Sequence, residues 1–229
     1  MFDTIINDVS LNAMGVLTVE RPNIPTPEQR IKTIDIEGRD GSLTQLLGYS
    51  DITFTIDFNI LEKTNIKPLI RQLRVILLNA KVMRFNDEPQ MFYKVKSVKV
   101  GDIDNQVSVY GKFDVTFTCD PFLYEDSFIN HVVSNSSAMT YLGSYFGQPS
   151  IRVGGNGVGK FSINGKVVEL TNLNDYVILD TSIANAYKGS VNMNQFMRGE
   201  FPTLIPGRNT ITFEGGITSL EIMPNTRHL

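Results

Sequence analysis

The residue types that perform nucleophilic catalysis are scarce in this chain of 229 residues. It contains one cysteine, Cys119, and two histidines, His131 and His228. A catalytic thiol or hydroxyl needs a base beside it, most often a histidine. His228 is the penultimate residue, where chain ends fray, and His131 lies in a Ser- and Asn-rich stretch, so we expect both to be solvated. Cys119 ends an alternating apolar pattern on its inward side, which predicts a buried structural thiol.

Metal and carboxylate chemistry is equally weakly supported. One cysteine and two histidines without ligand spacing cannot build a zinc site of the common kinds. Asp102 and Asp104 resemble the start of a calcium loop, but the glycine and terminal glutamate that such a loop needs do not follow, which favours a solvated turn. Asp175 and Asp180 flank an apolar segment and are the candidate carboxylate pair for glycoside hydrolysis. Because carboxylates often flank strands for solubility, we predict no catalytic, cofactor-binding or metal-binding residue.

Two further patterns suggest binding. Gly154–Gly159 holds four glycines in six residues, like a phosphate loop. No Lys-Ser/Thr pair and no helix follow it, so we interpret it as a β-turn. Sugar-binding proteins present aromatic side chains, and the chain has no tryptophan. Tyr141, Tyr145, Tyr176 and Tyr187 remain, and core or interface tyrosines are the favoured interpretation.

Composition excludes several classes of protein. The net charge is −3 and the pI is about 5.4, so the chain offers no basic surface for nucleic acid. A single cysteine allows no intrachain disulfide. The first thirty residues show no signal peptide, and no apolar run approaches the ~18 residues that span a bilayer. We therefore expect a soluble protein made in the cytoplasm.

Charge and glycine content divide the chain near residue 130. Residues 1–130 hold 14 basic and 18 acidic residues, whereas residues 131–229 hold 7 and 6. Glycine shows the opposite trend, with 6 in the first part and 12 in the second. We predict two domains, 1–130 and 131–229, with His131–Gly147 as a linker or a loose first strand.

The N-terminal part is predicted to be α+β, with an antiparallel sheet and one helix. Apolar residues at helical spacing from Ile66 to Leu77 predict the helix, with Asn65 or Thr64 as its cap and Pro68 in its first turn. Gly111 within a long strand suggests a bulge or a close backbone approach. Asp40-Gly41 supplies turn chemistry. Alternating patterns predict strands over Arg30–Ile36, Asp51–Ile60, Met91–Lys96 and Val107–Cys119.

The C-terminal part is predicted to be a small β-sandwich without helices. Asn164-Gly165 is a type I′ hairpin signal, and Pro206-Gly207 suits a type II turn. Gly154-Gly155 and Gly215-Gly216 are interpreted as further turns. Six short strands are expected at Ser150–Val153, Lys160–Ile163, Lys166–Leu170, Tyr176–Leu179, Asn209–Phe213 and Ser219–Ile222.

Five segments carry a family resemblance in the same order along essentially the whole chain. They are Glu37–Leu43, Phe117–Tyr124, Pro149–Val153, Ile178–Thr181 and Gly199–Ile211. The last contains the run Phe-Pro-x-Leu-x-Pro-Gly-x-Asn. Together they resemble the distal tail protein (Dit) family of long-tailed, non-contractile bacteriophages. The whole chain is then expected to be mainly β, and its C-terminal sandwich to be galectin-like.

The resemblance implies a structural hub without catalysis or cofactor. Six copies would form a ring at the tip of the tail tube, alone or as back-to-back rings. The N-terminal domains would make the ring, with a β-hairpin reaching onto the neighbouring subunit, while the sandwiches point outward. The ring would join the tail tube protein to the tail-associated lysin or fibre protein, and in many phages it carries receptor-binding proteins. DNA would pass through the channel without specific binding.

Location and charge follow from the same resemblance. The protein would reside in the virion, at the distal tail tip or baseplate, after assembly in the host cytoplasm, with no membrane insertion. An acidic N-terminal domain would suit a channel that does not hold DNA, because affinity for phosphate comes mainly from Lys and Arg. Some relatives carry an inserted carbohydrate-binding module, for which a C-terminal part of about a hundred residues has no room.

Three other functions are weighed against the hub. The runner-up is a carbohydrate-binding host-adhesion module that uses the C-terminal sandwich and a tyrosine such as Tyr176. A cell-wall-degrading tail enzyme acting through Asp180 is a weaker hypothesis. A tail tube component is a structural rival, but tube proteins usually lack a second sandwich.

Overall fold

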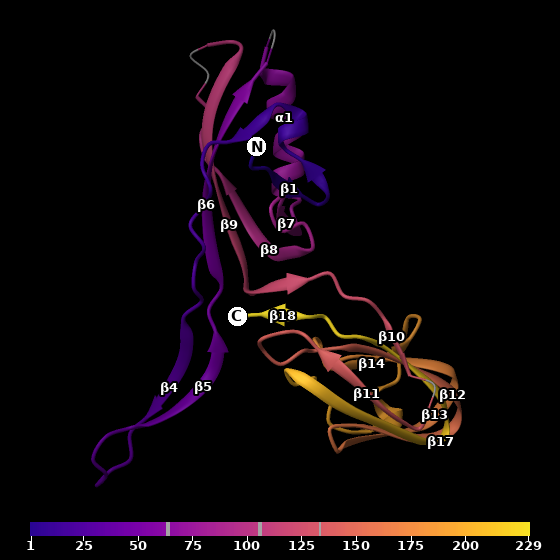
Figure 1. Ribbon diagram of the computed structural model, residues 1–229. Coiled ribbons are helices and arrows are strands. Elements are labelled where there is room, and N and C mark those ends of the chain that lie inside the picture. Colours follow the sequence, from indigo (N-terminus) through magenta and orange to yellow (C-terminus); the bar gives the residue numbers. More distant parts are fainter. Residues whose placement is uncertain (63–64, 105–106, 133) are drawn as a thin grey trace. The chain divides into compact units, whose positions relative to one another are not determined.

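The computed structural model describes residues 1–62, 65–104, 107–132 and 134–229 (Figure 1). The expected cap Thr64 lies outside these residues. The chain is 58% strand and 8% helix, and its sheets are antiparallel with one α-helix in the described part, which confirms the predicted mainly β class. It divides into two compact units, Met1–Leu123 with Leu229, and Tyr124–His228.

The first unit is built on a sheet with the order β2-β1-β7-β8-β9-β6-β3. Its two long central strands, β6 and β9, pair antiparallel from Ile52 opposite Cys119 to Leu61 opposite Tyr110. The strands are β1 (Thr4–Ile6), β2 (Val9–Ser10), β3 (Val16–Thr18), β6 (Ile52–Leu61), β7 (Val82–Phe85), β8 (Met91–Val100) and β9 (Tyr110–Glu125).

One face of this sheet forms the core. The alternation predicted for Asp51–Ile60 is confirmed, because Ile52, Phe54, Ile56, Phe58 and Ile60 are all buried. A helix covers this side: α1 (Lys67–Leu78) buries Leu69, Ile70, Leu73 and Leu77.

The middle of β9 follows its prediction, whereas the cap of α1 differs from it. The N-cap position is Ile66, which makes no side-chain cap hydrogen bond, so the expected cap at Asn65 was wrong by one residue. Asn65 still accepts a hydrogen bond from the backbone N–H of Lys67 at 2.9 Å, one residue before the N-cap. A side chain at Gly111 would approach the backbone oxygen of Asp104 and the side chain of Ile66 to 3.0 Å. The close backbone approach expected at Gly111 is therefore confirmed.

A hairpin in the same unit has no core. Strands β4 (Gln29–Ile34) and β5 (Leu43–Tyr49) form a two-stranded sheet of their own. The strand expected within Arg30–Ile36 is present, but all six residues of β4 are exposed, so its apolar side covers no core. Alternation of branched residues favours a strand whether or not anything covers it. We call residues 29–49 the arm.

The second unit is a two-layered structure in which eight strands form one continuous network, while β18 (Arg227–His228) pairs with β9 instead. The eight strands are β10 (Asn130–Val132), β11 (Ser136–Tyr141), β12 (Ser150–Ile163), β13 (Lys166–Asp180), β14 (Asn185–Lys188), β15 (Val191–Asn192), β16 (Met197–Gly199) and β17 (Gly207–Met223). Strands β13 and β17 flank β12 along both of its halves. Ile151 and Phe161, from opposite halves of β12, enter the same hydrophobic cluster. The halves therefore face each other across one core.

Three long strands replace the six short strands predicted for this unit. Gly154-Gly155 and Gly215-Gly216, which were predicted to be turns, lie inside β12 and β17 respectively. They bend these strands and do not end them. Register shifts occur at Gly154/Gly155 and between Gly157 and Gly159. A Cβ at Gly216 would lie 1.8 Å from the oxygen of Asn156. Only glycine lets the two backbones approach this closely.

The two expected turns of this unit are present. Asn164 and Gly165 both have positive φ, +54° and +80°, as a type I′ turn requires. Gly207 has φ +86°, in agreement with a type II turn. Asn209 is fully buried and fixes that turn, because its side chain accepts from the N–H of Ile205 and donates to the carbonyls of Ile205 and Gly207.

The core of the first unit gives a test of stability. Leu73 lies on the inner face of α1 and is fully buried, whereas Val75, two residues further along the same helix, is 62% exposed. We expect Leu73→Ala to lower the free energy of unfolding by about 2–5 kcal/mol, because it removes apolar contacts and leaves a cavity. Val75→Ala should change it by less than about 0.5 kcal/mol. Urea denaturation followed by circular dichroism measures both; equal effects would contradict the assigned helix face.

Candidate functional site

The single thiol is inert in this fold. Cys119 is fully buried at the end of the core face of β9, as predicted. Burial raises the pKa of Cys119 to about 12, and the carboxylates of Asp120 and Asp51 add to the effect. The thiol therefore stays protonated at neutral pH, and only a thiolate acts as nucleophile or metal ligand.

The two histidines differ from each other. His131 lies in β10 with its side chain 65% exposed, so it is solvated as expected. His228 does not fray: it belongs to β18, its side chain is 24% exposed, and its Nε2 lies 3.4 Å from Glu125. The neighbouring Arg227 explains the difference, since its backbone N–H donates to the hydroxyl of Tyr141 and its guanidinium donates to the carbonyl of Phe146.

The candidate carboxylates are not arranged for catalysis. Asp175 and Asp180 lie five residues apart in β13. An extended strand places such residues about 17 Å apart, well beyond the ~5–9.5 Å of a glycosidase pair. Asp180 instead accepts hydrogen bonds from the N–H and hydroxyl of Ser182, which holds a turn.

The regions considered for cations show no assembled ligand set. Asp104 lies in the connection between β8 and β9, where its N–H donates to the carbonyl of Lys112 at 2.8 Å. Across the part of the chain that the structure describes, no group of three or more His, Cys, Asp or Glu side chains could hold a metal ion. In the same residues, no helix is both long and apolar enough to cross a membrane.

The tyrosines do not form an open aromatic surface. Tyr141 is buried, and burial raises its pKa. Tyr176 lies under two cations, with the guanidinium of Arg152 4.4 Å and the amine of Lys188 5.1 Å from the centre of its ring. The ring face that a sugar would need is therefore engaged.

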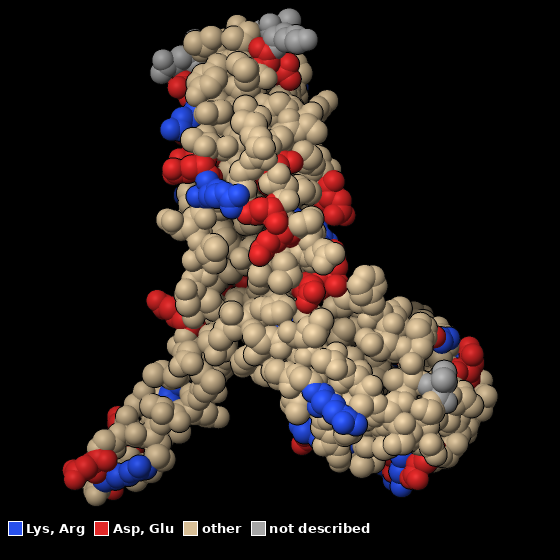
Figure 2. Space-filling view, viewed as in Figure 1, with Lys and Arg blue, Asp and Glu red and all other residues tan. Residues whose placement is uncertain are grey.

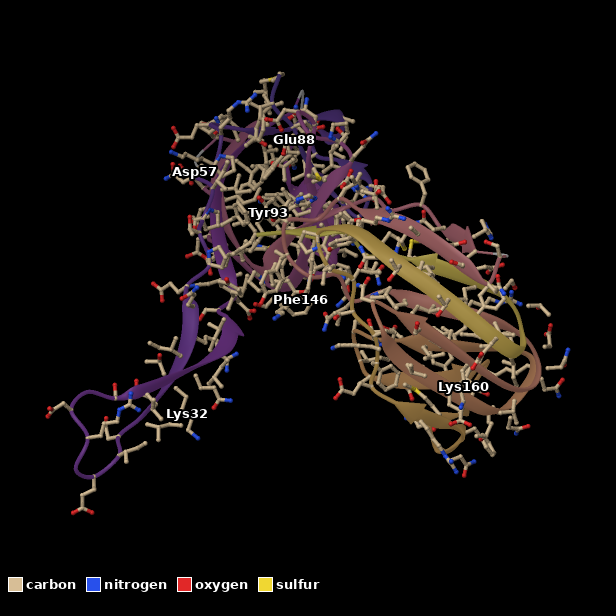
Figure 3. The ribbon with its side chains drawn as sticks, turned by 60° about the horizontal axis from the view of Figure 1, so that its bottom comes forward. Lys32, Asp57, Glu88, Tyr93, Phe146 and Lys160 are labelled. Carbon is tan, nitrogen blue, oxygen red and sulfur yellow. The ribbon has the colours of Figure 1, made fainter. Side chains whose placement is uncertain are left out.

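An apolar hollow in the first unit is small. Its volume is about 160 Å³, and Phe2, Phe85 and Tyr93 are among its lining residues. Tyr93, labelled with Glu88 in Figure 3, has its pKa raised to about 12 by burial and by the charge of Glu88. Pockets for drug-sized ligands usually measure ~300–1,000 Å³, so this hollow suits a single side chain better than a substrate.

The arm exposes several large apolar side chains that no described residue covers. Ile31 and Leu46 face each other across the hairpin and are 56% and 52% exposed. Ile34, Ile36, Leu43 and Leu47 are also exposed by 39% or more. Figure 3 shows the side chains of the arm, including the labelled Lys32, projecting into solvent on both sides of the ribbon. An exposed apolar surface of this kind indicates a protein partner.

The outer face of the β6–β9 pair is the second unusual surface, and the sequence analysis missed it. Thr53 lies opposite Thr118, and Thr55 opposite Thr116, where the two hydroxyls form a 3.3 Å hydrogen bond. The next pair outward, Asp57 opposite Asp114, places two carboxylates directly across from each other. Like charges in this position destabilise a sheet. We call these three pairs the threonine–aspartate face.

No described residue neutralises this pair of carboxylates by an ion pair. Two other carboxylates in the same part of the chain are neutralised, because the amine of Lys96 lies 2.6 Å from Asp51 and 2.8 Å from Asp120. Asp57 lies at the outer side of the unit in Figure 3. The two aspartates are opposed because of the register between β6 and β9. The sequence alone does not show which residues of two strands lie opposite each other, so this pair could not be found from it.

Comparison with known proteins places these surfaces in context. Residues 16–119 match the phage tail protein RIFT-related domain. The crystal structure of the Dit protein of phage SPP1, described as a paradigm of hub adsorption apparatus in phages infecting Gram-positive bacteria, superposes with a TM-score of 0.71. The two share 15% identity over 97% of this chain and 98% of that one, which shows a common fold.

Two baseplate structures of phage p2 in the activated conformation are more distant. The one with Sr has a TM-score of 0.49 at 8% identity, and the one with Ca has 0.48 at 9%. Each alignment covers 97% of this chain and 97% of the other. No curated protein matches the sequence.

Protection of the thiol is the first prediction from these sites. At pH 8, a pKa of about 12 leaves roughly one thiolate in ten thousand, so folded Cys119 should react with Ellman's reagent at least a hundredfold more slowly than in guanidinium. Stopped-flow absorbance measures both rates. Stoichiometric reaction of the folded chain within seconds would contradict the buried position.

The paired aspartates give the second prediction. Asp57→Asn should raise the free energy of unfolding by about 0.2–1 kcal/mol at low salt, because it removes a like-charge contact. Adding Asp114→Asn should bring little further gain, since the repulsion is already gone. In 1 M NaCl, where the screening length is about 3 Å, the gain should shrink. Destabilisation by Asp57→Asn would show that the carboxylate has a favourable partner.

Proposed function

We propose that this chain, which shares its fold with the Dit protein of phage SPP1, serves as the structural hub of a phage tail tip. The resemblance read from the sequence is confirmed by the RIFT-related domain over residues 16–119 and by the common fold with the SPP1 protein. In the proposal, six copies form a ring in the virion that joins the tail tube to the tail-associated lysin or fibre protein and to receptor-binding proteins.

The observation that carries the proposal is the uncovered arm. A two-stranded hairpin is marginally stable in water by itself, and here Tyr49 at its base contacts Phe122 while the apolar side chains farther along, such as Ile31 and Leu46, stay exposed. Contact with a second copy would bury Ile31 and Leu46 and remove that cost. Because the arm and the surface that receives it are different parts of the same chain, the contact is head-to-tail, which closes into a ring when the rotation allows.

The threonine–aspartate face suits the wall of a DNA channel. Its side chains are short and polar, and Asp57 and Asp114 are its charged members; the next pair on the same side is Asn59 opposite Lys112, so one cation borders two carboxylates there. In a ring of six, Asp57 and Asp114 would supply twelve carboxylates. Affinity for DNA comes chiefly from cations that replace condensed counterions, so this lining would let DNA pass without holding it.

The same reasoning argues against catalysis. The thiol of Cys119 is buried, the ring of Tyr176 contacts two cations, and Asp175 and Asp180 are far apart along one strand. The uncovered surfaces are those of an assembly protein. We therefore assign the function to contact and shape, and the alternative of a glycan-binding module gains no supporting observation from Tyr176.

Assembly in solution tests the proposal. Electron microscopy and mass measurement of the purified chain should show a ring with sixfold symmetry and a central hole. Ile31→Ser/Leu46→Ser should abolish the ring at the same protein concentration, because the cross-strand apolar pair is lost. Thr33→Ser/Thr44→Ser, another directly opposed pair in the same hairpin, is the matched control and should leave the ring intact. A strict monomer for the wild-type chain at high concentration would overturn the proposal.

A further inference from the structure

The exposed face of α1 carries three cations without partners. Lys67, Arg71 and Arg74 are spaced by four and three residues, which places them on one face of the helix. None of the three forms an ion pair with any residue that the structure describes. We call these three residues the basic face.

The basic face surrounds a hollow with an apolar floor. The hollow has a volume of about 280 Å³ and is lined by the three cations together with Ile70 and Ile103. It therefore combines positive charge at its rim with branched aliphatic side chains inside. A ligand that fits would offer one apolar side chain flanked by carboxylates.

The charges are unusual for their surroundings. Like charges spaced by three or four residues repel each other along a helix. Residues 1–130 hold 18 acidic and 14 basic residues, yet no described acidic residue forms an ion pair with these three cations. A cationic face that stays unpaired in an acidic domain is complementary to an acidic partner.

The tip of the arm has the complementary chemistry. The connection between β4 and β5 contains Asp35, Glu37 and Asp40 against a single cation, Arg39. Ile36 lies between two of these carboxylates and is 46% exposed. Figure 2 shows the acidic side chains gathered at the end of the arm beside a basic one.

We propose that the arm tip of a second copy docks on the basic face of α1. Ile36 enters the hollow against Ile70 and Ile103, and the carboxylates of Asp35 and Glu37 pair with Arg71 and Arg74. The inference rests on the proposed function, since it names the surface that receives the arm in the ring. It also makes α1, and not only the sheet, part of the contact between subunits.

A charge exchange tests this pairing. Arg71→Glu/Arg74→Glu should raise the protein concentration needed for half-assembly at least tenfold, and Asp35→Lys/Glu37→Lys should do the same. The four substitutions together restore opposite charges and should recover the ring. All four residues are exposed, so thermal melting should confirm that the variants fold. Lys99→Glu/Lys160→Glu, which reverses two exposed cations elsewhere, is the matched control.

The outcomes separate this inference from the proposed function. Loss of the ring in each double variant and its recovery in the fourfold variant support the docking. A ring that persists in Arg71→Glu/Arg74→Glu but is lost in Ile31→Ser/Leu46→Ser overturns the docking and leaves the hub standing. A fourfold variant that does not form the ring also overturns the docking. A ring that persists while the wild-type chain binds DNA in a mobility-shift assay through Arg71 and Arg74 would assign the basic face to nucleic acid instead. A wild-type chain that forms no ring overturns both the docking and the proposed function.

Discussion

Strands β6 and β9 pair antiparallel along their full overlap, and only one face of the pair is buried. On that face, residues such as Phe58 and Phe113 stack with their ring centres 5.5 Å apart and form the core beneath α1. Side chains alternate strictly along a strand, so burial of one face forces the opposite set outward. Ile56 opposite Val115 in the core thus obliges Asp57 to oppose Asp114 outside. The threonine–aspartate face is a direct consequence of the register that builds the core.

A different constraint shapes the second unit, where long strands must serve two layers. A strand that continues from one layer to the other has to bend, and a side chain at the bend would collide with its neighbour. Glycines at the middle of β12 and β17 remove that collision; a Cβ at Gly155 would lie 2.1 Å from the oxygen of Gly216. The high glycine content of the C-terminal part therefore reflects strand continuity, where the sequence analysis had inferred turns.

Much of the fold could be predicted because alternation and turn chemistry are local signals. The buried face of Asp51–Ile60, the helix α1 and the Asn164-Gly165 turn all follow from short stretches. Burial of a strand and the opposition of two side chains depend on distant residues instead. For that reason the exposed arm, the ordered His228 beside Glu125 and the Asp57–Asp114 pair were missed or misread. The surfaces that matter most here are set by pairing, which a local pattern does not encode.

The same logic explains how a chain with so little reactive chemistry can have a defined role. An isolated unit would gain stability from separating Asp57 from Asp114, because directly opposed like charges are unfavourable, and its exposed Ile31 favours association over a free surface. Features that cost a single copy free energy are explained when the working form contains several copies. In the proposed ring, a neighbouring copy would cover the arm, and the carboxylates of Asp57 and Asp114 would repel the phosphates of DNA in the channel. Specificity then resides in which copy covers which surface, and the unpaired charges of α1 and of the arm tip have the signs to select that pairing.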